Sequence, residues 1–165
     1  MATLVARCSC GKVELAATGA PITSVICHCE DCAAGARQIE ALPNAAAVLQ
    51  PDGGVGYLAY RKDRVRIVRG AELLQSYKIR QKSATKRMVA SCCNSAMILT
   101  FEDSKHWVNV YRARVVSDVP PLEMQICTKY RQGGTHHTTE PAFTGYPLRL
   151  VTKLLWARLA MLLGA

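Results

Sequence analysis

The feature that most constrains this chain is the run Cys-His-Cys-Glu-Asp-Cys at residues 27–32, which places three thiols within six residues. Seven of the eight cysteines fall into three tight groups, the other two being Cys8-Ser9-Cys10 and Cys92-Cys93. Thiols at such spacings can bind one ion from a single turn, because each zinc–sulfur bond is ~2.3 Å long. Disulfides between such close neighbours would close only very small loops. The grouping therefore predicts metal ligands, with thiols that are merely buried hydrophobic side chains as the alternative.

Length and composition predict a single domain. A chain of 165 residues, 50% of them hydrophobic, can bury a substantial core. The formal charge of +9 favours anionic partners, namely an acidic small molecule, a nucleic acid or a membrane surface. Residues 1–7 do not resemble a secretory signal, and no apolar run reaches the ~18 residues of a membrane span. We therefore expect a cytoplasmic protein with reduced thiols, in which clustered cysteines bind metal.

Short alternating segments separated by turns indicate a mainly β fold with antiparallel sheets. We expect a β domain over residues 1–130, a polar loop over 131–147 and a C-terminal amphipathic helix over 148–165. A short helix is also expected at residues 30–41, weakened by Gly35, and loops are expected at 51–56 and 80–87. The expected strands cover residues 3–7, 12–17, 23–26, 65–69, 73–79, 88–90, 97–101, 106–116 and 122–128, with another beginning at Tyr57.

The first and last thiol groups can together form a closed metal site. Cys8 and Cys10 offer one pair of ligands, and Cys92 and Cys93 are the distant candidates to complete it. Four thiolates around one zinc make a structural site, since no coordination position stays open. Such a site would join the first hairpin to the middle of the sheet.

The 27–32 group offers three ligands, Cys27, Cys29 and Cys32. Three protein ligands with an open fourth position are what a catalytic zinc requires, because a water or a substrate thiolate can then bind the ion. In the alternative, a fourth protein ligand closes this group and it carries no chemistry. We expect one structural zinc and, at this group, a second.

The order of these motifs resembles the glutathione-dependent formaldehyde-activating enzyme family, also called the GFA/CENP-V family. The resemblance rests on C-x-C-G, then C-H-C-x-x-C, then a Y-x-I strand followed by a C-C-N-S turn, between residue 5 and about residue 128. It implies a zinc β fold related to the Mss-type chaperones, a β-tent, with a zinc on each thiol group. The founding activity of the family is the addition of glutathione to formaldehyde. The resemblance therefore implies a carbon–sulfur lyase or transferase, with glutathione as a candidate substrate.

One departure from the family pattern concerns the later thiol pair. The C-x-x-C knuckle of the family would have its first thiol at position 90, where this chain has Ala90, and a thiol stands at Cys92 instead. Asn94 replaces the usual glycine, and asparagine also tolerates the left-handed backbone of such a turn. The chain thus resembles an uncharacterised A-S-C-C-N branch. Either Cys92 and Cys93 both bind the first zinc, which we favour, or Cys92 points toward the second.

Other polar and thiol side chains have both a functional and a structural interpretation. His28 lies between two ligands and is a weak candidate for proton transfer, because a residue there more often points away from the metal. Gln125 stands where the family has a histidine, and Cys127 is expected in the core. The adjacent His136 and His137 are expected in a loop, since neighbouring side chains of an extended segment point in opposite directions.

The basic segment and the C-terminal helix bear on partners. Residues 78–87 carry five cations, which either attract a small anionic thiol such as glutathione or form a solvated connection. Residues 148–163 are too apolar for a solvated helix, so this helix packs on the β domain, mediates self-association or, less favoured, lies on a membrane surface. The chain lacks an aromatic-rich stacking surface, which argues against nucleic acid.

The sequence predicts a zinc-binding protein for which two functions are open. In the first, a carbon–sulfur lyase or transferase, the second zinc binds a substrate thiolate and holds it for attack on, or release of, a carbonyl compound. The second is a non-catalytic interaction module that uses the basic surface and the C-terminal helix. A redox dithiol protein is a weaker third interpretation, based on the Cys29-x-x-Cys32 spacing.

Overall fold

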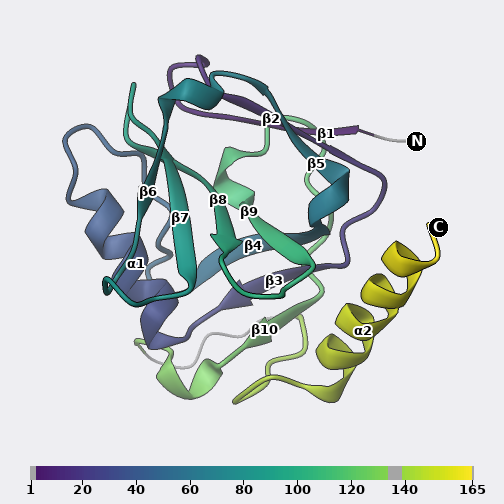
Figure 1. The fold of residues 1–165 in the computed structure, drawn as a ribbon. Coiled ribbons are helices and arrows are strands. Elements are labelled where there is room, and N and C mark those ends of the chain that lie inside the picture. Colours follow the sequence, from purple (N-terminus) through teal and green to yellow (C-terminus); the bar gives the residue numbers. More distant parts are fainter. Residues whose placement is uncertain (1–2, 134–138, 165) are drawn as a thin grey trace.

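The computed structural model describes residues 3–133 and 139–164, so the His136-His137 pair lies outside the described residues. Ten strands in this part of the chain form two sheets (Figure 1). The smaller sheet has the order β1-β2-β5, and the larger has the order β10-β3-β4-β9-β8-β7-β6. Neighbouring strands are antiparallel, except that β10 runs parallel to β3. The prediction of a mainly β fold with a C-terminal helix is confirmed.

The strands are short and most lie close to their predicted positions. Two begin inside predicted loops, at Val55 and Thr85, because pairing with Cys27 and Phe101 extends each ladder by several residues. The smaller sheet contains β1 (Thr3–Arg7), β2 (Glu14–Thr18) and β5 (Val65–Arg69). The larger sheet contains β3 (Thr23–Cys27), β4 (Val55–Arg61), β6 (Leu74–Tyr77), β7 (Thr85–Ala90), β8 (Ser95–Phe101), β9 (Trp107–Tyr111) and β10 (Met124–Ile126). The α-helices are α1 (Glu30–Glu40) and α2 (Leu148–Leu162), and four single-turn 3-10 helices of the described residues lie at 62–64, 71–73, 112–114 and 128–130.

The larger sheet separates two hydrophobic cores, because successive side chains of a strand point to opposite faces. One core joins the larger sheet to the smaller sheet and includes Leu58, Ile98 and Val110 with Leu4 and Leu15. The other core joins the larger sheet to the helices and includes Val25, Tyr57 and Leu99 with Ile39 and Leu150. A metal site on one face of the larger sheet is therefore separated by that sheet from a site on the other face.

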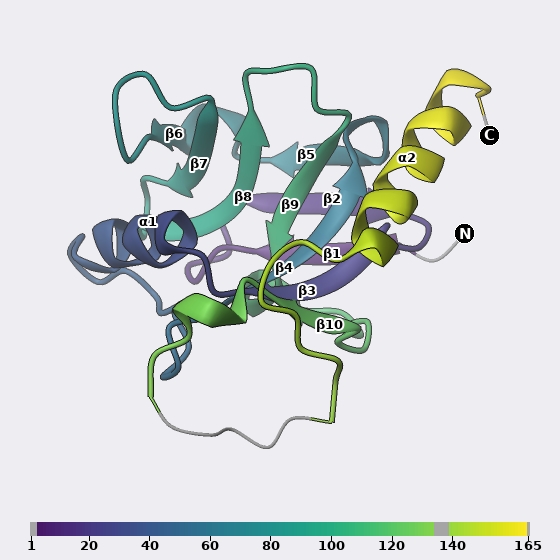
Figure 2. The same ribbon diagram turned by 90° about the horizontal axis from the view of Figure 1, so that it is seen from below.

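The two helices lie on opposite sides of the molecule, with β3, β4 and β9 between them (Figures 1 and 2). Helix α2 docks through the buried Leu150, and the His106 Nε2–H donates a hydrogen bond to the Leu154 carbonyl oxygen, 2.7 Å away. Its outer face exposes Leu148, Leu155, Trp156 and Leu162. Self-association or membrane binding through this face stays a prediction. Neither helix in the described part of the chain combines the length and hydrophobicity that crossing a bilayer requires.

Candidate metal centres and the adjoining cavity

The first thiol group forms where two hairpin turns meet. The β1–β2 turn carries Cys8 and Cys10, and the β7–β8 turn carries Cys92 and Cys93. The four sulfur atoms lie within 4.8 Å of one another. The Cys8–Cys10, Cys10–Cys92 and Cys8–Cys92 sulfur distances are 3.6, 3.3 and 3.9 Å. Sulfur atoms around a tetrahedral zinc lie ~3.8 Å apart, so this donor set fits a zinc ion closed by four thiolates.

The local backbone shapes this group as the sequence predicts. Asn94 has φ 52°, so asparagine does adopt the left-handed conformation that glycine has in the family pattern. Ala90 is fully buried, and Cys92, two residues later, brings its sulfur to the group in its place. Burial raises the pKa of the Cys93 thiol, but hydrogen bonds from the Ser95 hydroxyl, 3.1 Å from its sulfur, and from Cys10 and Cys8 together outweigh this effect and lower the pKa to about 6. Hydrogen bonding thus favours a thiolate, the form in which cysteine binds metal.

The second thiol group lies between the end of β3 and the start of α1. Cys27 ends β3, and Cys29 caps α1, its sulfur accepting a hydrogen bond from the Cys32 N–H at 3.4 Å. The three sulfur atoms lie within 4.8 Å of one another. Hydrogen bonds from the Cys27 and Cys32 thiols lower the pKa of Cys29 to about 3. Cys29 therefore favours the thiolate, the form in which cysteine binds metal, and three sulfur donors this close together fit a zinc ion with one position for another ligand.

A fourth thiol, that of Cys127, stands beside the second group. Cys127 is buried in the same core as Cys27, which agrees with its expected core position. The parallel pairing of β10 with β3 places Ile126 opposite Cys27. The next residue, Cys127, then hydrogen-bonds the Cys27 thiol, which lowers the pKa of Cys127 to about 7. No sequence motif indicates this contact, because a register between strands so distant in the chain has no local signal.

His28 lies on the other face of the strand from the thiol group. Its ring is buried, and the His28 Nε2–H donates a hydrogen bond to Gln125 Oε1, 2.9 Å away. Gln125 also accepts a hydrogen bond from Arg131. Both residues alternate with Cys27 and Ile126, which face the opposite way. A role for His28 in proton transfer stays a prediction, and its hydrogen bond to Gln125, which also binds Arg131, positions the chain after β10 instead.

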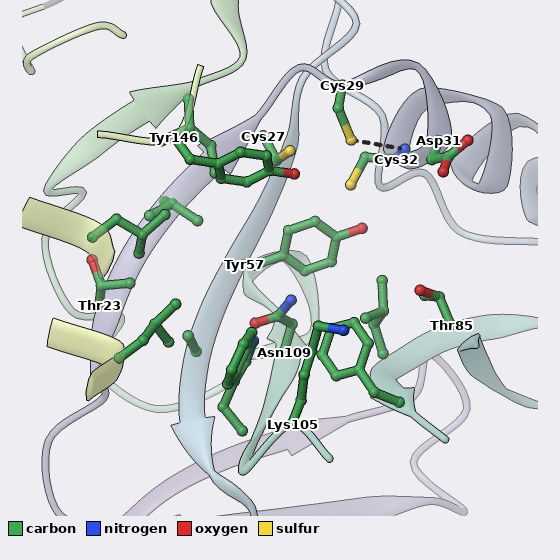
Figure 3. A pocket seen from close by; sticks show the side chains of 18 of the residues that line it. Thr23, Cys27, Cys29, Asp31, Cys32, Tyr57, Thr85, Lys105, Asn109 and Tyr146 are labelled. Atoms are coloured by element: carbon green, nitrogen blue, oxygen red, sulfur yellow. Dashed lines mark hydrogen bonds between the residues drawn. The ribbon is translucent and has the colours of Figure 1, made fainter. Parts of the chain in front are cut away.

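A cavity of about 530 Å³ adjoins the second thiol group (Figure 3). Cys27, Cys29 and Cys32 lie at one end, Tyr57 lies in the middle, and Lys105 and Asn109 lie at the other end. Alternate residues of neighbouring strands face it, as the pleat requires. These are Thr23 and Val25 of β3, Ala59 of β4, Thr85 and Arg87 of β7, Leu99 and Phe101 of β8, Trp107 of β9 and Ile126 of β10.

Arg87 is the member of the basic segment that reaches the cavity, whereas Lys78 and Lys86 pair with Glu102. Its side chain is 1% exposed, and its Nη2–H donates to the Asp31 carbonyl oxygen at 2.7 Å. Its Nε and Nη1 have no hydrogen-bond partner among the described residues. Gly35 makes room for it, because a Cβ there would collide with the guanidinium.

The hydroxyl of Tyr57 is a second polar group of this wall. It is buried and has no hydrogen-bond partner within the described residues. Burial, together with the nearby Cys32 thiol, raises the pKa of Tyr57 well above its usual value, so the hydroxyl stays protonated. Unsatisfied buried polar groups are costly. Arg87 and Tyr57 therefore offer hydrogen bonds to a polar atom of a ligand.

Comparison with known proteins agrees with this geometry. A model of the glutathione-dependent formaldehyde-activating enzyme family matches residues 3–128. The chain belongs to this family. A crystal structure of a Rhodobacter sphaeroides protein, a Northeast Structural Genomics target, shares the fold, with a TM-score of 0.51 and 18% identity. The similarity covers 85% of this chain and 99% of that one. A comparison with curated proteins found no match.

Membership in the glutathione-dependent formaldehyde-activating enzyme family implies a zinc-binding protein related to glutathione chemistry. The two thiol groups supply the donor sets that zinc needs. The match ends at residue 128, so α2, which contributes to the cavity wall, lies outside the residues shared with the family model.

Proposed function

We propose that this protein is a zinc-dependent carbon–sulfur lyase or transferase that acts on the adduct of a thiol with a small aldehyde. The observation that carries the proposal is the position of Cys27, Cys29 and Cys32 at one end of a cavity of about 530 Å³. Bound there, zinc would lower the pKa of a substrate thiol and hold it as a thiolate. Glutathione is the reference thiol, because the family is named for it.

The two thiol groups have separate roles in this proposal. Cys27, Cys29 and Cys32 hold the zinc of the cavity. The other set holds a structural zinc between the two hairpins and consists of Cys8, Cys10, Cys92 and Cys93, none of which is among the described residues that line the cavity. Loss of the structural set would therefore affect the fold before the chemistry.

The reaction breaks or forms one carbon–sulfur bond. In the lyase direction the adduct hydroxyl loses its proton to solvent, the carbon–oxygen double bond forms, and the bonding electron pair leaves with sulfur as the thiolate. Negative charge develops on the oxygen before the bond breaks. The Tyr57 hydroxyl and the free N–H groups of Arg87 are placed on the cavity wall to hydrogen-bond that oxygen. The cavity residues thereby orient the adduct and shield it from water.

The test measures metal content and exchange kinetics of the purified protein. We expect two zinc ions per chain and faster interconversion of formaldehyde and glutathione with S-hydroxymethylglutathione, followed by exchange NMR. Cys32→Ser should lose one zinc and the rate enhancement while keeping the fold, as circular dichroism would show. A rate in the zinc-loaded protein no higher than in Cys32→Ser would contradict the proposal.

Cys127→Ser is the matched control, because Cys127 is also a thiol beside Cys27 but lies outside the three-sulfur group. We expect this variant to keep both ions. Loss of the second zinc in Cys127→Ser would show a site closed by four protein ligands, and would support the non-catalytic alternative.

A further inference from the structure

Most side chains that line the cavity between its two ends are apolar. Leu99, Phe101 and Trp107 line it from the larger sheet, and Leu150, Val151 and Leu154 line it from α2. Aliphatic and aromatic side chains cannot satisfy the polar groups of a peptide, and burying an unpaired amide costs free energy. The wall therefore favours a ligand whose central part is hydrocarbon.

The apolar wall is partly a property of this chain's C-terminal segment. The three α2 residues lie beyond residue 128, where the match to the family model ends. Leu150 is buried, and two polar contacts fix the helix against the domain: His106 to the Leu154 carbonyl oxygen, and Lys153 to Glu123. A docked helix of this kind can determine which thiol the shared site accepts.

Charged side chains of the lining are few and largely engaged. Among the described residues that line the cavity, three are charged, namely Asp31, Arg87 and Lys105. Asp31 is exposed at the thiol end, and Arg87 is buried and bonded to the Asp31 carbonyl. Lys105 lies at the far end, paired with Asp103 and 4.8 Å above the Phe101 ring. Glutathione would have to place two carboxylates and an ammonium in this space, where its sulfur end and one carboxylate, near Lys105, have a counterpart and the other two charges do not.

We propose that the cavity accepts a thiol, free or as its aldehyde adduct, that has an alkyl or aryl body and a single polar or anionic far end. Its sulfur lies at Cys27, Cys29 and Cys32, a placement that rests on the proposed function. Its body lies between the sheet and α2, and its far end lies near Lys105 and Asn109. The substrate class is thus an amphiphilic thiol with one terminal charge.

The test titrates the zinc-loaded protein with ω-mercaptocarboxylates of increasing chain length, from mercaptoacetate to mercapto-octanoate, by calorimetry. Each buried methylene should tighten binding about fourfold until the cavity is filled. Mercapto-octanoate should then bind at least tenfold more tightly than glutathione. Equal affinity along the series, or tighter binding of glutathione than of mercapto-octanoate, would overturn the inference.

Two variants test whether the gain in affinity per methylene arises at the apolar wall formed by α2. Leu154→Ser should reduce the gain per methylene, because it removes part of the apolar wall. Leu159→Ser, on the exposed face of the same helix, should leave the gain unchanged. An equal effect of the two substitutions would place the ligand elsewhere and contradict the inference.

A parallel titration with plain carboxylates of the same lengths separates this inference from the proposed function. If the carboxylates show the gain per methylene but the thiol group adds nothing to affinity, the inference stands and the proposed role of the second zinc fails. If thiols bind in a zinc-dependent way without any gain per methylene, the proposed function stands and the inference fails. If neither series binds, both fail.

Discussion

Replacing Gly35 with alanine should destabilise this protein, although the same change stabilises most helices. Alanine is favoured over glycine inside a helix by about 1 kcal/mol. At this position, however, the new Cβ would overlap the Arg87 guanidinium and lie 2.6 Å from its Nη2. Arg87 is 1% exposed, so it cannot move aside without leaving its hydrogen bond to the Asp31 carbonyl.

The magnitude follows from these contacts. Losing a hydrogen bond to a charged group costs about 2 kcal/mol, and overpacking a buried site costs about 1–3 kcal/mol. After subtracting the helix gain, we expect a net loss of about 2–4 kcal/mol in the free energy of unfolding. For a chain of this length, that corresponds to a fall of roughly 5–15 °C in melting temperature.

The assay is urea unfolding of the zinc-loaded protein, followed by circular dichroism, for Gly35→Ala, Arg87→Ala and the double variant. In the Arg87→Ala background the collision is absent, so Gly35→Ala should stabilise the protein by about 1 kcal/mol. Gly35→Ala should thus lower the free energy of unfolding in the wild-type protein and raise it in the Arg87→Ala variant. Stabilisation in the wild-type background, or an equal loss in both backgrounds, would refute the reasoning.

Further predictions concern the metal sites and α2. Cys93→Ser should lose one zinc and lower the melting temperature by about 10 °C, whereas Cys32→Ser should lose one zinc with little thermal effect; metal analysis with calorimetry checks both. Burial lowers the pKa of His106, so the unfolded chain binds a proton that the folded protein excludes. Stability should therefore fall as the pH drops below the unfolded value of ~6.5, and His106→Gln should remove this part of the dependence. Hydrogen exchange of α2 should rise over the same range, because the buried Nδ1 of His106 can take up its proton only when α2, which His106 contacts at the Leu154 carbonyl, moves away.

The thiol groups could be found from the sequence because their signal is local. Cys8 and Cys10 are in one turn, and Cys92 and Cys93 are in another. The only long-range contact that had to be predicted was therefore the one between these two turns. The structure brings these four sulfur atoms together. The mainly β fold could also be predicted, because short segments in which apolar and polar residues alternate are typical of strands.

The features that required the structure depend on contacts between distant segments. Cys127 meets Cys27 through the parallel register of β10 and β3, which no local pattern encodes. Arg87 stands in a basic segment that the sequence suggests is polar, yet it is buried against α1 where Gly35 leaves space. The cavity itself depends on how α2 docks, and helix docking is set by packing rather than by periodicity.

The meeting of the two hairpin turns has a topological consequence. Cys10 and Cys92 are 82 residues apart, and the chain between them contains β3, α1 and the entire second thiol group. A zinc ion at the first group would close this segment into a ring. If the ring acts as a disulfide does, it lowers the conformational entropy of the unfolded chain and thereby stabilises the folded state by on the order of 4–5 kcal/mol. Helix α2 lies outside the ring. If both thiol groups bind zinc as proposed, a chelator that removes zinc from the first group should also release the second ion, because the ring then opens. Mild zinc depletion should empty the second group first and leave the protein folded.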